Sequence, residues 1–182
     1  FYKYEGFNTS LRIKKGLFFY HVPKCAGSTF SVVMSHLFKK SYRIMGPFSN
    51  KNDKGENSAY DNFLKRKNEI LLNNYDFIYG HVPLELHNYF KKNYFFVTLL
   101  RDPIQRTLSH YNWALNHNYI SKEDRFENLF SNNKIPSNIM VKQFSGKYFL
   151  NKKNNLLKLA ENNLFNKINL IFDIDDISVL FN

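Results

Sequence analysis

The sequence has very little cysteine and no long apolar run, and each absence excludes a class of protein. Cys25 is the only cysteine among the 182 residues, so an internal disulfide is excluded. Zinc sites built from pairs of cysteines are excluded for the same reason. No uninterrupted apolar stretch approaches the roughly 20 residues that cross a bilayer, so we expect no membrane span in this chain. The first residues also lack the pattern of a secretory signal.

Apolar and positively charged residues are abundant instead. Hydrophobic residues make up 43% of the chain and include 19 Phe and 12 Tyr, which is ample for a packed core. The length fits a single domain over residues 1–182. The formal net charge of +11 indicates a surface that attracts anions, such as nucleic acid, a membrane face, an acidic glycan or a nucleotide. Charge alone does not choose among these partners.

Strand patterns and helix patterns alternate along the chain. Three apolar runs predict strands, at residues 17–22, 76–81 and 94–100, and the last is apolar on both faces, which favours a central position in the sheet. A short fourth strand is expected at residues 168–172. Helices are expected from Ser28, over 59–73, over 83–91, from Pro103 and over 155–165, with a last helical turn near the end. This order predicts an α/β fold in which helices flank a mainly parallel sheet.

The helix that begins at Pro103 and the polar segment before residue 59 carry further expectations. Asp102 is a good N-cap, and apolar residues recur behind it at helical spacing. We expect this stripe to be buried, and it consists of Ile104, Leu108, Tyr111 and Leu115. Residues 46–58 form a polar surface loop that would border a substrate cleft.

The first segment that could carry chemistry follows the first strand. Its sequence is F-F-Y-H-V-P-K-C-A-G-S-T-F, residues 18–30. A loop between a strand and a helix offers free backbone N–H groups, and Lys24 adds a positive charge, so phosphate is a natural ligand. Lys24 precedes Gly27, whereas the common ATPase and GTPase loop has its lysine after the second glycine. The alternative is an ordinary turn in which Ser28 caps the helix.

The second segment lies at the end of the strand at residues 94–100. Its sequence is L-L-R-D-P-I-Q-R-T-L-S-H-Y, residues 99–111. The guanidinium of Arg101 suits two phosphate oxygens, and the Ser109 hydroxyl would complete the pocket, with help from Arg106. The alternative for Arg101 is an ion pair with Asp102 or a capping role, and for Ser109 a plain helix position.

Together the two segments resemble the 5′-phosphosulfate loop and the 3′-phosphate loop of sulfotransferases that use 3′-phosphoadenosine 5′-phosphosulfate (PAPS). They are most similar to the carbohydrate branch that includes heparan sulfate 2-O- and 6-O-sulfotransferases and bacterial relatives. The resemblance covers residues 17 to about 148, and residues 138–146 and 171–177 are similar to segments of the bacterial relatives. It implies a P-loop-like sulfotransferase fold.

The resemblance also implies roles for individual residues. Arg101 and Ser109 would bind the 3′-phosphate of the donor. The 5′-phosphosulfate would be held by Lys24, Cys25, Ala26, Gly27, Ser28 and Thr29. Lys24 would also neutralise the charge that builds on the leaving oxygen, so no metal is expected. Relatives carry a further loop over the adenine after their last segment, and this sequence ends at Asn182.

The third segment is G-H-V, residues 80–82, at the end of the second predicted strand. An acceptor hydroxyl must lose a proton as it attacks sulfur, and imidazole titrates near working pH, so His81 is the expected catalytic base. In the similar heparan sulfate enzymes a histidine or glutamate at the corresponding strand end has this role. Glu85 is the reserve candidate. The alternative is that backbone groups satisfy His81 at a strand end.

The predicted reaction is sulfuryl transfer from PAPS to a hydroxyl, with a carbohydrate as the favoured acceptor. A non-catalytic basic module that binds nucleic acid or an anionic glycan is the main alternative, and a kinase is a weaker one because no acidic pair for magnesium is evident beside the loop. We expect no nucleic acid partner. The chain would be cytoplasmic in a bacterium, or would belong in the Golgi lumen if it were trimmed from a eukaryotic protein.

Overall fold

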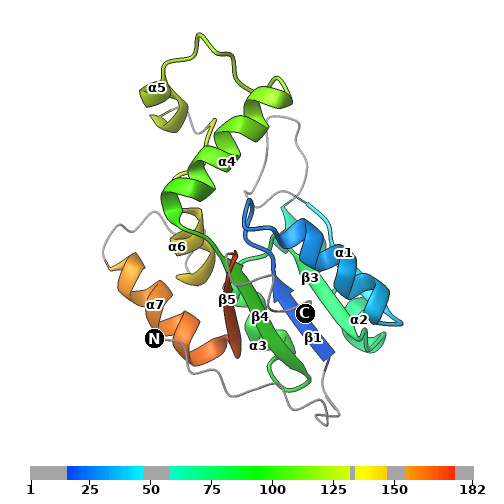
Figure 1. Ribbon diagram of the computed structural model, residues 1–182. Helices are drawn as coiled ribbons and strands as arrows, with labels where there is room; N and C mark the ends of the chain where they lie inside the picture. Colours follow the sequence, from blue (N-terminus) through cyan, green and yellow to red (C-terminus); the bar gives the residue numbers. More distant parts are fainter. Residues whose placement is uncertain (1–15, 47–57, 132–133, 147–154, 175–182) are drawn as a thin grey trace.

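The computed structural model describes residues 16–46, 58–131, 134–146 and 155–174 (Figure 1). Strands and helices alternate through the first two thirds of the chain. In chain order the elements are β1 (Gly16–Tyr20), α1 (Gly27–Leu37), β2 (Ser41–Ile44), α2 (Ala59–Leu72), β3 (Phe77–Gly80), the 3₁₀ helix η1 (Leu84–Leu86), α3 (His87–Phe90), β4 (Tyr94–Leu100), α4 (Pro103–Asn116), α5 (Phe126–Ser131), α6 (Ile139–Phe144), α7 (Leu156–Lys167) and β5 (Leu170–Asp173).

The strands form a 5-stranded sheet in the order β2-β3-β1-β4-β5, and every pairing is parallel. The structure therefore confirms the predicted single α/β domain with a parallel sheet between helices. The middle strand is β1, so the expectation that residues 94–100 form the central strand is wrong. The apolar pattern did not separate the two strands, because β1 is equally buried on both faces, with Phe18 and Phe19 both fully buried.

Alternate side chains of β1 build the core on the two faces of the sheet. Phe18 and Tyr20 point to one face, where the Phe18 ring lies 4.9 Å from that of Phe90 in α3. Phe19 points to the opposite face and packs 4.6 Å from Phe30 of α1. Figure 1 shows the same division, with α1 in front of the sheet and α3 behind it. The direction of each side chain of β1 thus decides which helix it contacts.

The elements that the sequence did not predict correctly are those with the weakest local patterns. The edge strand β2 is only four residues long and includes the exposed Arg43, so it shows no apolar run. The helix expected over residues 83–91 is shorter and consists of η1 and the single turn α3. The helices α5 and α6 were not predicted. The expected last helical turn and most of the polar segment 46–58 lie outside the described residues.

Helix α4 begins as predicted but buries a different face. Asp102 caps it, because its carboxylate accepts hydrogen bonds from two N–H groups of the first turn. The predicted buried stripe is wrong in its first half, since Ile104 is 70% exposed and Leu108 is 45% exposed, whereas Tyr111 and Leu115 are partly buried. The buried positions are Arg106 and Ala114. The reason is visible in Figure 1, where α4 extends away from the sheet toward α5.

The outer half of α4 packs in a second, smaller core. Ala114, Ile120, Leu129 and Ile135 form this cluster, which lies apart from the core around the sheet. Segments on both sides of α5 therefore cover the end of α4 that the sheet does not reach. No helix within the described ranges is both long enough and apolar enough to cross a membrane.

Replacing Ser58 with alanine tests the start of α2. Ser58 is the N-cap; its buried Oγ accepts a hydrogen bond from Asp61 N at 3.1 Å and donates one to Asp61 Oδ2 at 2.7 Å. We expect Ser58→Ala to lower the free energy of unfolding by about 1 kcal/mol, measured by urea denaturation. Lys65→Ala, at an exposed site on the same helix, is the control and should leave it unchanged. Equal stability of the two variants would contradict the capping role.

Candidate functional site

Three neighbouring strands end at the same edge of the sheet and support the loop between β1 and α1. His81 follows β3 directly, and its Nδ1 lies 2.9 Å from the carbonyl oxygen of His21. Arg101 follows β4, and its Nη1 donates to the carbonyl oxygen of Lys24 at 3.5 Å. Because β3 and β4 lie on either side of β1, the loop is held from both sides. The structure thus brings the three predicted segments together.

The loop between β1 and α1 contains two residues with a left-handed backbone conformation. Lys24 has a φ of 69° and Ala26, at the N-cap position, has a φ of 54°. No side chain caps α1. The N–H groups of its first turn therefore have neither an acceptor within the helix nor a capping side chain. The alternative in which Ser28 caps the helix is wrong, and Ser28 and Thr29 are exposed beside these donors.

Gly27 is required for a reason that the sequence did not reveal. A Cβ atom at this position would lie 2.1 Å from Cδ2 of His21, far inside any contact that two carbon atoms tolerate. The imidazole of His21 thus packs directly against the first turn of α1. Glycine at this position keeps the ring in the interior and the loop close to the strand end.

Cys25 faces the interior. Its side chain is fully buried, and burial raises the pKa of the thiol to about 12. The backbone N–H of Cys25 donates to the carbonyl oxygen of Val22 at 3.3 Å. The thiol is therefore neither a nucleophile at neutral pH nor exposed to a ligand.

His21 and His81 form a pair of imidazoles with ring centroids 4.2 Å apart. Burial, the neighbouring His81 and the guanidinium of Arg43 lower the pKa of His21 to about 3. Burial also lowers the pKa of His81, so both rings are neutral at pH 7. A carbonyl oxygen only accepts hydrogen bonds, so Nδ1 of His81 carries the proton and Nε2 keeps its lone pair. The backbone hydrogen bond therefore orients the His81 ring and leaves Nε2 unprotonated.

The reserve candidate, Glu85, belongs to the other face of the sheet. Its carboxylate contributes to raising the pKa of Tyr20, which is fully buried. Tyr20 and His21 are consecutive, so their side chains point to opposite faces. Glu85 lies in η1, which leads into α3, and α3 packs against Phe18 on the face of the sheet opposite the pair of histidines.

The carboxylate of Asp102 caps α4. Its Oδ1 accepts from Ile104 N at 3.0 Å and from Gln105 N at 2.9 Å. Arg101 is half-buried and donates to the loop, so the suggested ion pair between these two residues is not formed. Ser109 lies in the second turn of α4 and is half-buried.

A buried arginine adds to the positive charge of this region. Arg106 is only 2% exposed and donates through Nη2 to the carbonyl oxygen of Pro136 at 3.2 Å. Its Nη1 is buried without a hydrogen-bond partner among the described residues. Partial burial and the nearby Arg101 lower the pKa of Lys24. These three cations form no ion pair in the described part of the chain, which is the arrangement expected where an anionic ligand supplies the counter-charge.

Two further neighbours of the site were missed by sequence reasoning. Nζ of Lys24 lies 5.6 Å from the ring centroid of Trp113 in α4. Arg43 lies close enough to lower the pKa of both His21 and His81. Arg43 could not be assigned because its strand was not predicted. Trp113 stands one helical turn after Ser109, and that spacing was the available signal.

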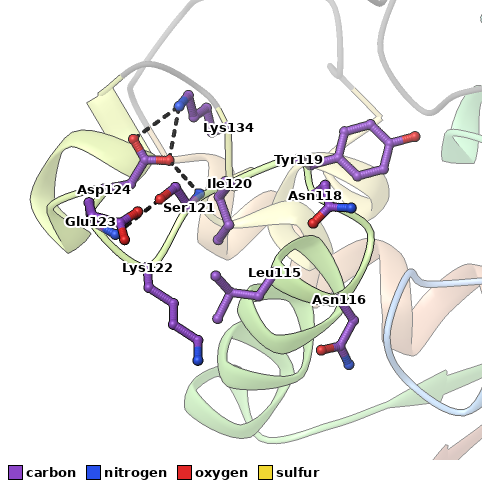
Figure 2. Close-up of a pocket in the computed structure, with 10 residues that line it drawn as sticks. All are labelled: Leu115, Asn116, Asn118, Tyr119, Ile120, Ser121, Lys122, Glu123, Asp124 and Lys134. Carbon is purple, nitrogen blue, oxygen red and sulfur yellow. Dashed lines mark hydrogen bonds and ion pairs between the residues drawn. The ribbon is translucent and has the colours of Figure 1, made fainter.

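A hollow of about 650 Å³ lies at the far end of α4, and none of the predicted site residues lines it (Figure 2). Lys134 and Asp124 form an ion pair of 3.0 Å beside it. Among the residues that the structure describes, no group of three His, Cys, Asp or Glu side chains is arranged to hold a metal ion.

The arrangement has the features of a site that binds an anion beside a base. A family model described as Sulfotransferase family matches residues 11–166. The chain belongs to the sulfotransferase family. The match covers both predicted nucleotide loops, the pair of histidines and four of the five strands, β1 to β4. None of the curated proteins compared with the sequence matches it. The family confirms the predicted sulfuryl transfer, and it implies a hydroxyl-bearing acceptor.

The pair of histidines makes the stability of this sulfotransferase depend on pH. His21 has a pKa of about 3 in the folded chain against 6.5 for a free imidazole, so between these values the unfolded chain binds one more proton there. The free energy of unfolding should therefore fall as the pH falls through this window, by up to about 1.4 kcal/mol per pH unit for each such histidine. We expect His21→Asn to lower the number of protons taken up on unfolding by about one, which makes this slope shallower. Urea denaturation from pH 7 to pH 4 measures the slope. An identical slope in the variant would contradict the buried neutral state of His21.

Proposed function

We propose that this sulfotransferase transfers the sulfuryl group of PAPS to a hydroxyl of a carbohydrate. The observation that carries the proposal is the uncapped first turn of α1, with Lys24 before it and His81 bound to the same loop. An anion bound at this turn would lie between a cation and a base. That is the arrangement a sulfuryl transfer requires.

The residues of the two loops fit the charges of the donor. The backbone and side chains that would hold the 5′-phosphosulfate are those of Lys24, Cys25, Ala26, Gly27, Ser28 and Thr29. Cys25 would take part only by shaping the backbone, because its thiol faces the core. Arg101 and Ser109 would bind the 3′-phosphate. The unpartnered Nη1 of Arg106 supports a strongly anionic ligand near the start of α4.

Two side chains would perform the chemical step. The donor supplies a sulfuryl group bonded to a phosphate oxygen, which leaves with the electrons of the S–O bond. Nε2 of His81 would accept the proton of the acceptor hydroxyl as that oxygen bonds to sulfur. The ammonium of Lys24 would stabilise the negative charge that develops on the departing phosphate oxygen. The hydrogen bond to His21 O keeps Nδ1 protonated, so the lone pair of His81 is on Nε2, which would face the acceptor.

The carbohydrate acceptor is supported by the resemblance of the two loops and of G-H-V to the carbohydrate branch of the family. His81 is favoured as the base over Glu85, since the carboxylate of Glu85 helps to raise the pKa of Tyr20, whose side chain points to the opposite face of the sheet. Lys24 is favoured as the group that stabilises the departing phosphate oxygen, because it precedes the uncapped helix α1 and carries no ion pair in the described structure.

Alanine at Lys24 or Arg101 tests the donor site. Each variant loses a charge-assisted contact, so we expect the affinity for 3′-phosphoadenosine 5′-phosphate to fall by about 10-fold to 100-fold, measured by calorimetric titration. ATP, which lacks the 3′-phosphate, should bind more weakly to the unsubstituted protein. Lys65→Ala removes a charge from the exposed face of α2 and should leave the affinity unchanged. No preference over ATP, or no loss in either variant, would contradict the proposed donor.

Substitution of His81 separates chemistry from donor binding. We expect His81→Gln to lower kcat by about 10²-fold to 10⁴-fold, since the hydroxyl then loses its base, while the donor affinity stays within about twofold. Release of the 3′,5′-bisphosphate nucleotide in the presence of oligosaccharide acceptors measures the rate. Glu85→Gln is the matched variant on the other face and should retain activity. The opposite ranking would assign the base to Glu85.

A further inference from the structure

An exposed stack of aromatic side chains begins beside Lys24 and runs outward along α4. The rings of Trp113 and Tyr119 are nearly parallel, at 19°, with centroids 5.2 Å apart. His117 lies against the same indole at 4.7 Å. Trp113 is 36% exposed and Tyr119 is 56% exposed, which is unusual for stacked aromatic rings that serve only the core. Nζ of Lys24 lies 5.6 Å from the centroid of Trp113.

The contact between Lys24 and Trp113 locates the stack relative to the reacting atoms. In the proposed function Lys24 contacts the sulfuryl end of the donor. The adenine lies at the other end of the same nucleotide, beyond the ribose and the 5′-phosphate. In this binding mode a ring system that contacts Lys24 lies nearer to the sulfuryl end of the donor, where the acceptor must bind, than to the adenine.

The chemistry of the stack and of its surroundings favours a polyhydroxylated, uncharged ring. The face of an aromatic ring carries negative potential, so it attracts C–H groups and repels sulfate and carboxylate. Tyr119 is also among the residues that line the hollow shown in Figure 2, together with Asn116, Asn118 and Ser121. Amides and hydroxyls both donate and accept hydrogen bonds, as sugar hydroxyls require.

The formal charge of the hollow also argues against an anionic occupant. Two lysines and two carboxylates line it, and Lys134 is already paired with Asp124 at 3.0 Å. The charges that line the hollow are thus balanced, whereas Lys24, Arg101 and Arg106 form no ion pair in the described part of the chain.

We propose that Trp113 and Tyr119 form a binding platform for a neutral sugar unit of the acceptor, with the hydrogen-bonding groups of the hollow beyond it. The flat C–H face of the pyranose stacks on the exposed surface of the two rings. Its hydroxyls face Asn116 and Asn118. This inference rests on the proposed function, since it takes the sulfuryl group to lie at Lys24.

Trp113 is the only tryptophan in the sequence, so its emission reports directly on the platform. The protein is first saturated with 3′-phosphoadenosine 5′-phosphate, and this step measures donor binding independently. Neutral tetrasaccharides of glucose and of N-acetylglucosamine are then titrated while only tryptophan is excited. We expect a saturable change in emission with at least one neutral tetrasaccharide and none with a sulfated heparin tetrasaccharide.

Substitutions in the platform test whether the emission change comes from a sugar bound there. Tyr119→Ala should weaken the binding of the neutral tetrasaccharide by about tenfold, as expected for the loss of one aromatic contact. Trp113→Leu, followed by calorimetry, should weaken it at least as much. Tyr119→Ala leaves the contact between Lys24 and Trp113 in place, so it should keep the affinity for the nucleotide within about twofold. Phe165→Ala removes an aromatic side chain that is 80% exposed on α7 and should change neither affinity.

Several outcomes would overturn the inference while leaving the donor site intact. The first is nucleotide binding without any response to a neutral tetrasaccharide, and the second is a preference for the sulfated tetrasaccharide. The third is a response to p-nitrophenol, a phenol without a sugar ring, when neither neutral tetrasaccharide gives one. A loss of nucleotide affinity in Tyr119→Ala would instead assign the platform to the adenine of the donor. If the nucleotide itself fails to bind, the proposed function fails with the inference that rests on it.

Discussion

The attachment of one loop to both neighbouring strand ends is the constraint on which the site depends. The β1–α1 loop has two residues in the left-handed region, and its carbonyl oxygens at His21 and Lys24 accept from His81 and Arg101. Each of these contacts joins a different strand to the loop. Because the strands are parallel and adjacent, a shift in the pairing of β3 or β4 with β1 would displace a partner of the loop. His81, the β1–α1 loop and the guanidinium of Arg101 are therefore positioned by the sheet itself.

The same region holds positive charge that the described residues do not neutralise. Arg106 is buried without a carboxylate, and Lys24 and Arg101 lie near enough for one to lower the pKa of the other. Such an arrangement destabilises the ligand-free fold and gains free energy when an anion binds. Trp113 suits this setting because an aromatic face orients an ammonium without neutralising it. A carboxylate there would compete with the phosphates of a donor.

Strong local patterns predicted the main elements of the fold. The strand at residues 94–100 and the cap at Asp102 were correct because a continuous apolar run and a capping side chain next to proline are local signals. The pattern failed for α4, where Ile104 is exposed and Arg106 is buried. Helical spacing identifies an apolar stripe, but it does not reveal that the helix leaves the sheet. The short strand β2 was missed because a polar edge strand is defined by its hydrogen bonds to β3.

The sequence by itself determined the family, and it predicted the two loops and the candidate base, because these lie in contiguous motifs at the ends of recognisable strands. Only the tertiary structure decided how these parts act on one another. It brought His21 against His81, turned the thiol of Cys25 inward and put Glu85 on the other face of the sheet. It also brought Trp113 to Lys24. These relations join residues far apart in the chain, and they follow from strand order and helix direction, which no local pattern encodes.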